Sequence, residues 1–229
     1  MILIIRGHIR STFEDRNFYN FIKKIHGLIP DLSIYIHTWN VFSNKLSWRK
    51  IEEDNRIVTT DTILEYFDDL KSIIKKIIVD DESAITLIGN TMGNVSSGNM
   101  PTKGWKNYWY GKYKIIHNVS SNETILNTRF DVLNNSNNFD ENELIQFILS
   151  NNGKKFHKNV FLYNKKFCGL DNIYMGSLTT MRTLAKTFHY KLDSIVKKHK
   201  TRFQEFLVYT INDTIFHDPY KRVNMFILK

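Results

Sequence analysis

Arginine and histidine side chains follow the first apolar run of the chain, and their types suit the binding of phosphate. Arg6, Gly7, His8 and Arg10 come directly after the apolar residues 1–5. Glycine allows the backbone to approach a ligand closely, while arginine and histidine donate charge-assisted hydrogen bonds to phosphate oxygens. We therefore expect a diphosphate site at this turn, with a turn of ordinary surface basic residues as the alternative. The chain has neither a GxGxxG motif nor a P-loop motif, which argues against those two phosphate-binding folds.

Polar residues also end two other predicted strands. His37 and Trp39 end the second apolar run, and Arg129 and Asp131 lie at the end of a strand predicted at 124–129. A carboxylate can bind a divalent cation through its oxygens, and a cation at Asp131 would neutralise a diphosphate. The alternatives are a buried histidine packed against a tryptophan, and a simple ion pair between Arg129 and Asp131.

Two further carboxylates are expected to serve in catalysis. Asp171 enters a short apolar run, and Glu205 opens a helical segment. A positioned carboxylate can accept the proton of an attacking hydroxyl group as a general base. The alternatives are that Asp171 caps a turn and that Glu205 lies near a helix N-terminus only because negative charge is stabilised there.

A long loop is expected at residues 90–104, because this stretch is rich in glycine, asparagine and serine. Long loops inside compact domains often carry function. We expect this loop to close over the ligand and exclude water, with Asn90 at its start contacting the substrate.

The elements that must position these residues follow from the apolar periodicity. Strands and helices alternate over the first two thirds of the chain, and helices dominate the last third. The strand, helix and strand at the start favour a nucleotide-binding α/β fold, whose ligand lies at the carboxyl ends of the strands. Strands are predicted at 1–6, 32–37, 83–89, 124–129, 159–163 and 171–175. Helices are predicted at 18–25, 63–77, 105–117, 141–149 and 177–217, the last one broken near the basic run 197–200 and restarting at Thr201.

The composition of the 229-residue chain predicts one soluble domain that spans residues 1–229. Hydrophobic residues make up 42% of the chain, which is enough to form a self-sufficient core. Cys168 is the only cysteine, so a disulfide framework is excluded and a reducing compartment, the cytoplasm, is expected. No apolar run approaches the ~20 residues that a transmembrane helix needs.

The formal net charge of +9 predicts an anionic partner, which is a nucleic acid, a lipid headgroup or a nucleotide pyrophosphate. The basic last third could hold the protein at the inner face of an anionic membrane, where lipid-linked acceptors occur. Solvated helix faces explain the same charges equally well. Charge alone does not choose among these partners.

The order of the motifs resembles that of bacterial capsule and lipopolysaccharide glycosyltransferases with a GT-A-like fold; similar enzymes occur in large DNA viruses. The resemblance spans residues 2 to about 210 and rests on short motifs. They are Gly7-His8-x-Arg10 after an opening strand, Ile36-His37-Thr38-Trp39, Thr128-Arg129-Phe130-Asp131, and Asp171 followed five residues later by Gly176-Ser177.

The resemblance implies a single Rossmann-related nucleotide-sugar-binding domain with a mostly parallel sheet and a helical C-terminal third. It implies transfer of a sugar from a nucleotide-sugar donor to a saccharide or lipid-linked saccharide acceptor. The family's Asp-x-Asp motif usually binds the diphosphate and its metal, and this role falls on Arg129 and Asp131. Because Arg129 replaces the first Asp, a requirement for manganese or magnesium is left open. The resemblance also places Gly7 and His8 against the nucleotide and Asp171 near the acceptor.

Two other functions fit the same residues. The charge and the aromatic residues Trp105, Trp109, Tyr110 and Tyr113 would suit a nucleic-acid-binding module, although no known nucleic-acid-binding signature is present and we expect no nucleic-acid partner. A nucleotidyltransferase or phosphotransferase would use similar phosphate contacts and release a different product.

Overall fold

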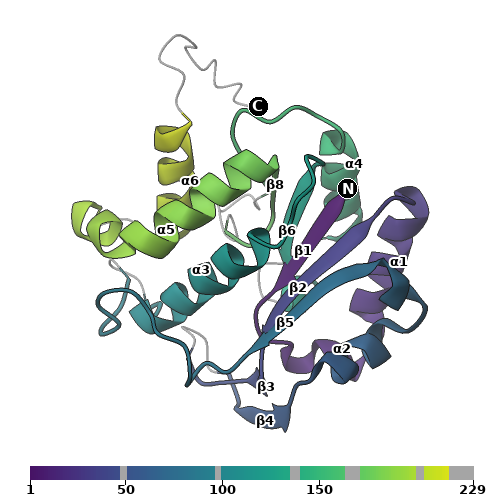
Figure 1. Ribbon diagram of the computed structural model, residues 1–229, viewed down its shortest axis with the longest axis horizontal. Coiled ribbons are helices and arrows are strands. Elements are labelled where there is room, and N and C mark those ends of the chain that lie inside the picture. The colour runs from purple at the N-terminus through teal and green to yellow at the C-terminus, as the bar shows by residue number, and fades with distance from the viewer. Residues whose placement is uncertain (47–50, 96–98, 135–139, 163–170, 200–203, 217–229) are drawn as a thin grey trace.

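A six-stranded sheet forms the centre of the protein (Figure 1). The computed structural model describes residues 1–46, 51–95, 99–134, 140–162, 171–199 and 204–216. The strands are β1 (Ile2–Arg6), β2 (Ser33–Trp39), β5 (Ile74–Asp80), β6 (Ile125–Arg129), β7 (Val160–Phe161) and β8 (Tyr174–Gly176). Their order is β5-β2-β1-β6-β8-β7, in which the first four run parallel and β8 and β7 are antiparallel to their neighbours. The predicted α/β fold with a mostly parallel sheet is confirmed.

Helices cover both faces of the sheet, and two hydrophobic cores result. Leu3 and Ile5 of β1 point into a core shared with one group of helices, and Ile2 and Ile4 point into a core shared with the other group. The first group is α1 (Asn17–Leu28), α2 (Thr60–Phe67) and α4 (Glu141–Asn151). The second is α3 (Thr102–Ile116), α5 (Leu178–Lys198) and α6 (Gln204–Ile215), which includes the predicted helical last third. β1 is buried on both sides, as a central parallel strand must be.

Short elements complete the described chain. The strands β3 (Val41–Ser43) and β4 (Asp54–Ile57) form a separate antiparallel pair. The 3-10 helices are η1 (Arg10–Glu14), η2 (Asp68–Ile73) and η3 (Phe130–Val132). Among the described residues, no helix combines the length and the hydropathy needed to cross a bilayer. Cys168, the restart at Thr201 and the predicted helix end at His217 lie outside the described residues.

The predicted helix at 63–77 and the predicted strand at 83–89 are wrong. Helix α2 ends at Phe67, Asp68 adopts a φ of 48°, and residues 74–80 form β5 beside β2. Apolar residues at 70, 73, 74 and 77 fit helical spacing and also fit a 3-10 turn followed by a strand, so periodicity alone could not separate the two. Residues 83–89 form turns and irregular chain. The loop predicted at 90–104 ends earlier than expected, because α3 begins at Thr102.

Helix α3 passes so close to β2 that only glycine fits at the crossing. A Cβ atom at Gly111 would lie 2.5 Å from Nδ1 of His37, which is buried. We expect Gly111→Ala to destabilise the protein by about 1–3 kcal/mol through overpacking, despite the better helix propensity of alanine. Urea unfolding measures the change. Gly27→Ala is the matched control, because a Cβ at Gly27 of α1 meets nothing within 4 Å; this change should stabilise by about 0.5–1 kcal/mol. An equal increase in the free energy of unfolding of both variants would contradict the close crossing.

Candidate functional site

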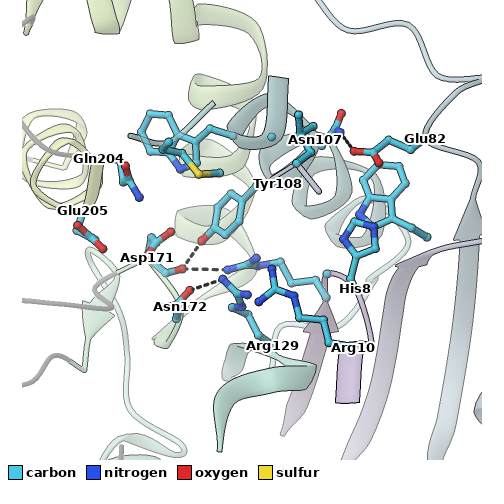
Figure 2. Close-up of a pocket in the computed structure, with 17 residues that line it drawn as sticks. His8, Arg10, Glu82, Asn107, Tyr108, Arg129, Asp171, Asn172, Gln204 and Glu205 are labelled. Carbon is cyan, nitrogen blue, oxygen red and sulfur yellow. Dashed lines mark hydrogen bonds between the residues drawn. The ribbon is translucent and has the colours of Figure 1, made fainter. Parts of the chain in front are cut away.

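A cleft opens at the carboxyl ends of β1, β2 and β6 (Figure 2). Basic side chains form its floor, Glu82 and Asn107 lie on one wall, and the other wall, called the carboxylate wall below, carries Asp171, Asn172, Gln204 and Glu205. It is lined by Arg6, Gly7, His8, Arg10, Trp39, Leu46, Glu82, Met100, Gly104, Trp105, Asn107, Tyr108, Arg129, Asp171, Asn172, Gln204 and Glu205. Loops and strand ends that are far apart in the sequence therefore meet at the edge where α/β folds bind ligands.

The parallel register places two of the arginines side by side. Arg6 ends β1 and pairs with Arg129 at the end of β6, so both side chains leave the sheet on the face that α3 covers. Arg6 is buried, and its guanidinium carbon lies 3.5 Å from the centre of the Tyr108 ring. Its Nη2 donates to the backbone oxygen of Asp171 at 3.2 Å. Burial lowers the pKa of Arg6, because the charged form loses its hydration.

Arg10 reaches the cleft through a constrained turn. Gly7 has a φ of 94°, and Arg10 has a φ of 56°, which is rare for a residue with a side chain. Such left-handed residues cost of order 1–3 kcal/mol and persist where the surroundings enforce them. Here the guanidinium of Arg10 forms an ion pair with the carboxylate of Asp131. The strain is therefore located at the turn that the sequence predicted as the diphosphate site.

Asp131 is held by two arginines and lacks the surroundings of a metal ligand. Arg129 donates to it through two bonds of 2.6 Å, from Nε to Oδ1 and from Nη2 to Oδ2, and Arg10 donates to Oδ2 as well. Divalent cations need several oxygen ligands, yet no group of three or more His, Cys, Asp or Glu residues that could hold a metal occurs in the part of the chain that the structure describes. The residues present around Asp131 do not fit a divalent cation.

His8 is partly buried at the rim, near the arginines and Trp39. Its Nε2 atom has no hydrogen-bond partner, and its ring centre lies 6.0 Å from that of Trp39. Burial, and then the positive charges of Arg10 and Arg129, lower the pKa of His8 to about 3. His8 is therefore neutral near pH 7 and can give one hydrogen bond to a ligand through whichever ring nitrogen carries the proton.

The depressed pKa of His8 predicts a loss of stability in mild acid. The unfolded chain binds a proton at His8 below about pH 6.5, whereas the folded protein does not bind it until about pH 3. The free energy of unfolding should thus fall as the pH drops through this window, by about 2 kcal/mol between pH 7 and pH 5 from His8 alone. Urea unfolding at both pH values measures the fall, and His8→Gln should reduce it. Burial also lowers the pKa of His37, so this residue still contributes to the fall in the free energy of unfolding in that variant. His117→Gln, at an exposed position, is the control; an identical fall in all three proteins would contradict the prediction.

Three donors, of which Arg6 and Lys112 are buried, hold the backbone at Asp171. Besides Arg6, the amine of Lys112 donates to the Asp171 backbone oxygen at 3.1 Å, and the hydroxyl of Tyr108 donates to it as well. The Lys112 amine also lies 4.3 Å from the centre of the Tyr174 ring. Burial, and then the neighbouring Arg6, lower the pKa of Lys112 well below its usual value. Sequence reasoning missed Tyr108 and Lys112, because helical spacing in an aromatic stretch is typical of a plain core stripe.

The carboxylate wall contains both predicted catalytic residues. Asp171 and Asn172 lie across the cleft from Glu82 and Asn107, and Gln204 and Glu205 at the start of α6 complete this side (Figure 2). Asn172 accepts a hydrogen bond of 3.2 Å from Nη1 of Arg129, so the wall is tied to the arginine floor. The structure therefore brings two carboxylates from distant segments to the same cleft as the arginines.

The opposite wall presents groups suited to a flat or polar ligand. Trp39 stacks against Tyr110, with ring centres 6.1 Å apart. Beside it, the side-chain amide of Asn107 donates to Glu82, whose pKa burial raises. Asn107 and Glu82 were not predicted, because Glu82 directly precedes the strand predicted at 83–89 and Asn107 lies within the helix predicted at 105–117. Four cleft residues carry buried polar atoms without a partner, namely Arg6 Nε, His8 Nε2, Trp105 Nε1 and Asn107 Oδ1. A polar ligand would satisfy such atoms.

Two predicted substrate-binding residues lie outside the cleft. His37 pairs with Asp80 at 3.0 Å and is covered by α3, which is the alternative given above of a buried, satisfied histidine. Asn90 donates its backbone N–H to Asp193 of α5 at 2.8 Å, and Asp193 also accepts from Lys106 at 2.6 Å. The start of the predicted lid is therefore anchored to α5, and Asn90 is not among the residues that line the cleft, whereas Met100 and Gly104 near the end of the predicted loop are.

Most of the aromatic side chains that suggested nucleic-acid binding are buried or stacked on other rings of the protein. Trp105 and Trp109 are fully buried, and Trp109 stacks on Phe188 with ring centres 4.1 Å apart. Tyr113 stacks on His189 at 4.3 Å. Stacking of bases needs exposed rings, so these two tryptophans are not available for the alternative function of nucleic-acid binding.

Comparisons with known proteins give a loose structural likeness. No protein-family model and no curated protein matches the chain. A crystal structure of an active-site mutant of LgtC is 10% identical, with 93% of this chain and 70% of that chain covered and a TM-score of 0.39. A complex of the galactosyltransferase LgtC with donor and acceptor sugar analogues is also 10% identical, with 94% and 70% covered and a TM-score of 0.38. Because these identities and TM-scores are low, a function for the protein has to be argued from the residues of the cleft.

Proposed function

We propose that the protein is a glycosyltransferase that moves a sugar from a nucleotide-sugar donor to a saccharide acceptor. The observation that carries the proposal is the convergence of Arg6, Arg10 and Arg129 at the ligand edge of a parallel sheet. Arginine is the side chain best suited to phosphate, because its planar fork donates two parallel hydrogen bonds. The diphosphate of the donor would lie on these arginines.

The two walls suit the two other parts of such a donor. Trp39 and the polar pair Glu82 and Asn107 would contact the nucleoside, since an aromatic face packs on a base and amide and carboxyl groups hydrogen-bond its edge or ribose. Asp171 and Glu205 would face the sugar and the acceptor. The cleft encloses about 90 Å³, less than the roughly 300–1,000 Å³ of small-molecule sites. Binding would therefore have to widen it by moving rim side chains.

The proposed reaction is a displacement at the anomeric carbon. The bond from this carbon to the diphosphate oxygen breaks, and its electron pair stays on the diphosphate beside the arginines. In an inverting reaction, the acceptor hydroxyl oxygen forms the new bond and gives its proton to a carboxylate, for which Asp171 is the first choice. The acceptor is a free or lipid-linked saccharide, and the proposed location is the cytoplasm at the inner face of a membrane, which the basic surface would favour.

A nucleotide panel tests the proposal. We expect UDP, GDP, CMP or ADP to raise the melting temperature of the protein, because a ligand at 100 times its Kd stabilises by about 2.7 kcal/mol. The nucleotide that does so names the donor, and incubation of the matching nucleotide sugar with mixed saccharides should release the nucleotide and a glycoside. Release of pyrophosphate or of a phosphorylated acceptor would instead indicate a nucleotidyltransferase or phosphotransferase.

Matched variants locate the site in the same assay. Arg129→Met should abolish the shift in melting temperature. Lys75→Met removes the same charge from an exposed residue of β5, near the opposite edge of the sheet, and should keep the shift. No shift with any nucleotide, together with binding of unspecific DNA or RNA at moderate salt, would replace the proposal with the nucleic-acid function.

A further inference from the structure

We infer that the arginines of the cleft stabilise the diphosphate without a divalent cation at Asp131, and that Asp131 is a positioning residue for Arg10 and Arg129. The inference rests on the proposed function, since it assigns how that site binds its leaving group. It differs from the expectation that Asp131 binds manganese or magnesium.

The electron pairs of Asp131 are already used by cationic donors. The two bonds from Arg129 and the bond from Arg10 engage both carboxylate oxygens. A divalent cation on these oxygens would lie next to two guanidinium groups and would be repelled by both. To bind one, Asp131 would have to release the arginines, which are four-fifths buried and would lose their counter-charge.

Arg6 adds an observation that points to a ligand. This side chain is nine-tenths or more buried, makes no ion pair within the described residues, and has an Nε–H group without an acceptor. A buried cation without a counter-ion is costly. An anionic oxygen in the cleft would supply both the missing charge and the missing acceptor. The three arginines therefore form an anion site that is completed from outside the protein.

In the proposed transfer, these arginines do the work that a cation would otherwise do. As the bond between the anomeric carbon and the diphosphate oxygen breaks, negative charge grows on that oxygen. The guanidinium groups are fixed before the reaction, Arg10 and Arg129 by Asp131 and Arg6 by Tyr108. Donors that are already oriented stabilise developing charge without reorganisation.

Inorganic pyrophosphate is the probe for this inference. The whole protein is stripped with EDTA, and pyrophosphate binding is measured by calorimetry in EDTA and again with excess manganese or magnesium, each corrected for the binding of the metal to pyrophosphate. We expect the two dissociation constants to agree within threefold. Binding at least tenfold tighter with the cation, binding only with the cation, or no binding in either condition would each overturn the inference.

Two variants separate positioning from metal binding. In Asp131→Asn, the ratio of the two dissociation constants should stay near one; a wild-type ratio of ten or more that falls to one in this variant would identify Asp131 as a metal ligand. Arg6→Lys keeps the charge but loses the planar fork, and pyrophosphate should bind at least tenfold more weakly in both conditions. The proposed function fails separately, if pyrophosphate binds without a cation but no nucleotide sugar is turned over.

Discussion

Arg6→Met should reduce sugar transfer by about 10²–10³ while leaving the protein as stable as the wild type or more stable. The loss follows from the removal of one preorganised donor to the diphosphate. The retained stability follows from the surroundings of Arg6, whose buried charge contacts a backbone oxygen and the face of a tyrosine and forms no ion pair within the described residues. Product formation and urea unfolding of the same preparation measure the two effects.

Arg129→Met is the informative comparison, because this arginine has a counter-ion. Its removal leaves Asp131 buried with one partner fewer, and breaking such a pair costs about 3 kcal/mol or more. Both variants should lose transfer, but only Arg129→Met should unfold at a clearly lower urea concentration. If Arg6→Met instead lost several kcal/mol and kept its activity, Arg6 would be a structural residue.

Asp171→Asn should lower the rate of transfer by about 10²–10⁴ and leave the affinity for the nucleotide unchanged, if Asp171 is the general base. The three donors that hold this residue bind its backbone oxygen, so the change of side chain leaves them in place. Single-turnover assays and calorimetry with the nucleotide separate the rate from the affinity.

Glu205→Gln removes the same charge from the same wall and distinguishes the two carboxylates. We expect a loss of less than about tenfold, since a group that assists only by its charge contributes less than the base itself. A large loss in Glu205→Gln with near-normal transfer in Asp171→Asn would exchange their roles. A fall in nucleotide affinity in both variants would place the two carboxylates at the donor instead.

The ligand edge could be read from the sequence because it depends on strand ends. Buried strands at the start of the chain and before Arg129 are short apolar runs followed by polar turns, so both arginines could be placed at the carboxyl ends of strands. That Arg6 lies beside Arg129 depends on the pairing of β1 with β6, which only the structure shows. The outer strand β5 could not be separated from a helix, since its register and burial depend on β2, which lies far away in the sequence.

The remaining differences arise from packing between distant segments. His37 ends its strand as predicted, yet Gly111 of α3 brings a helix directly over its ring, and no local pattern reveals that crossing. Asn90 is hydrogen-bonded through its backbone N–H to Asp193, a residue about one hundred positions later, and does not line the cleft. Lys112 looks like a surface lysine by its type, and only the fold shows that it lies beneath Asp171. Strand ends were thus predictable, and helix positions across the sheet were not.

Chemical labelling of the buried amine of Lys112 can report how often helix α3 separates from the sheet. Acylating reagents attack the neutral form of an amine, and the lowered pKa of Lys112 favours that form, while the rings of Tyr108, Trp109 and Tyr174 keep reagents away. Its labelling is therefore limited by how often α3 separates from the sheet. Mass spectrometry after timed exposure to an acylating reagent would measure the rate of Lys112 labelling, and thus the rate at which this wall of the cleft opens. A ligand that closes the cleft would slow the labelling.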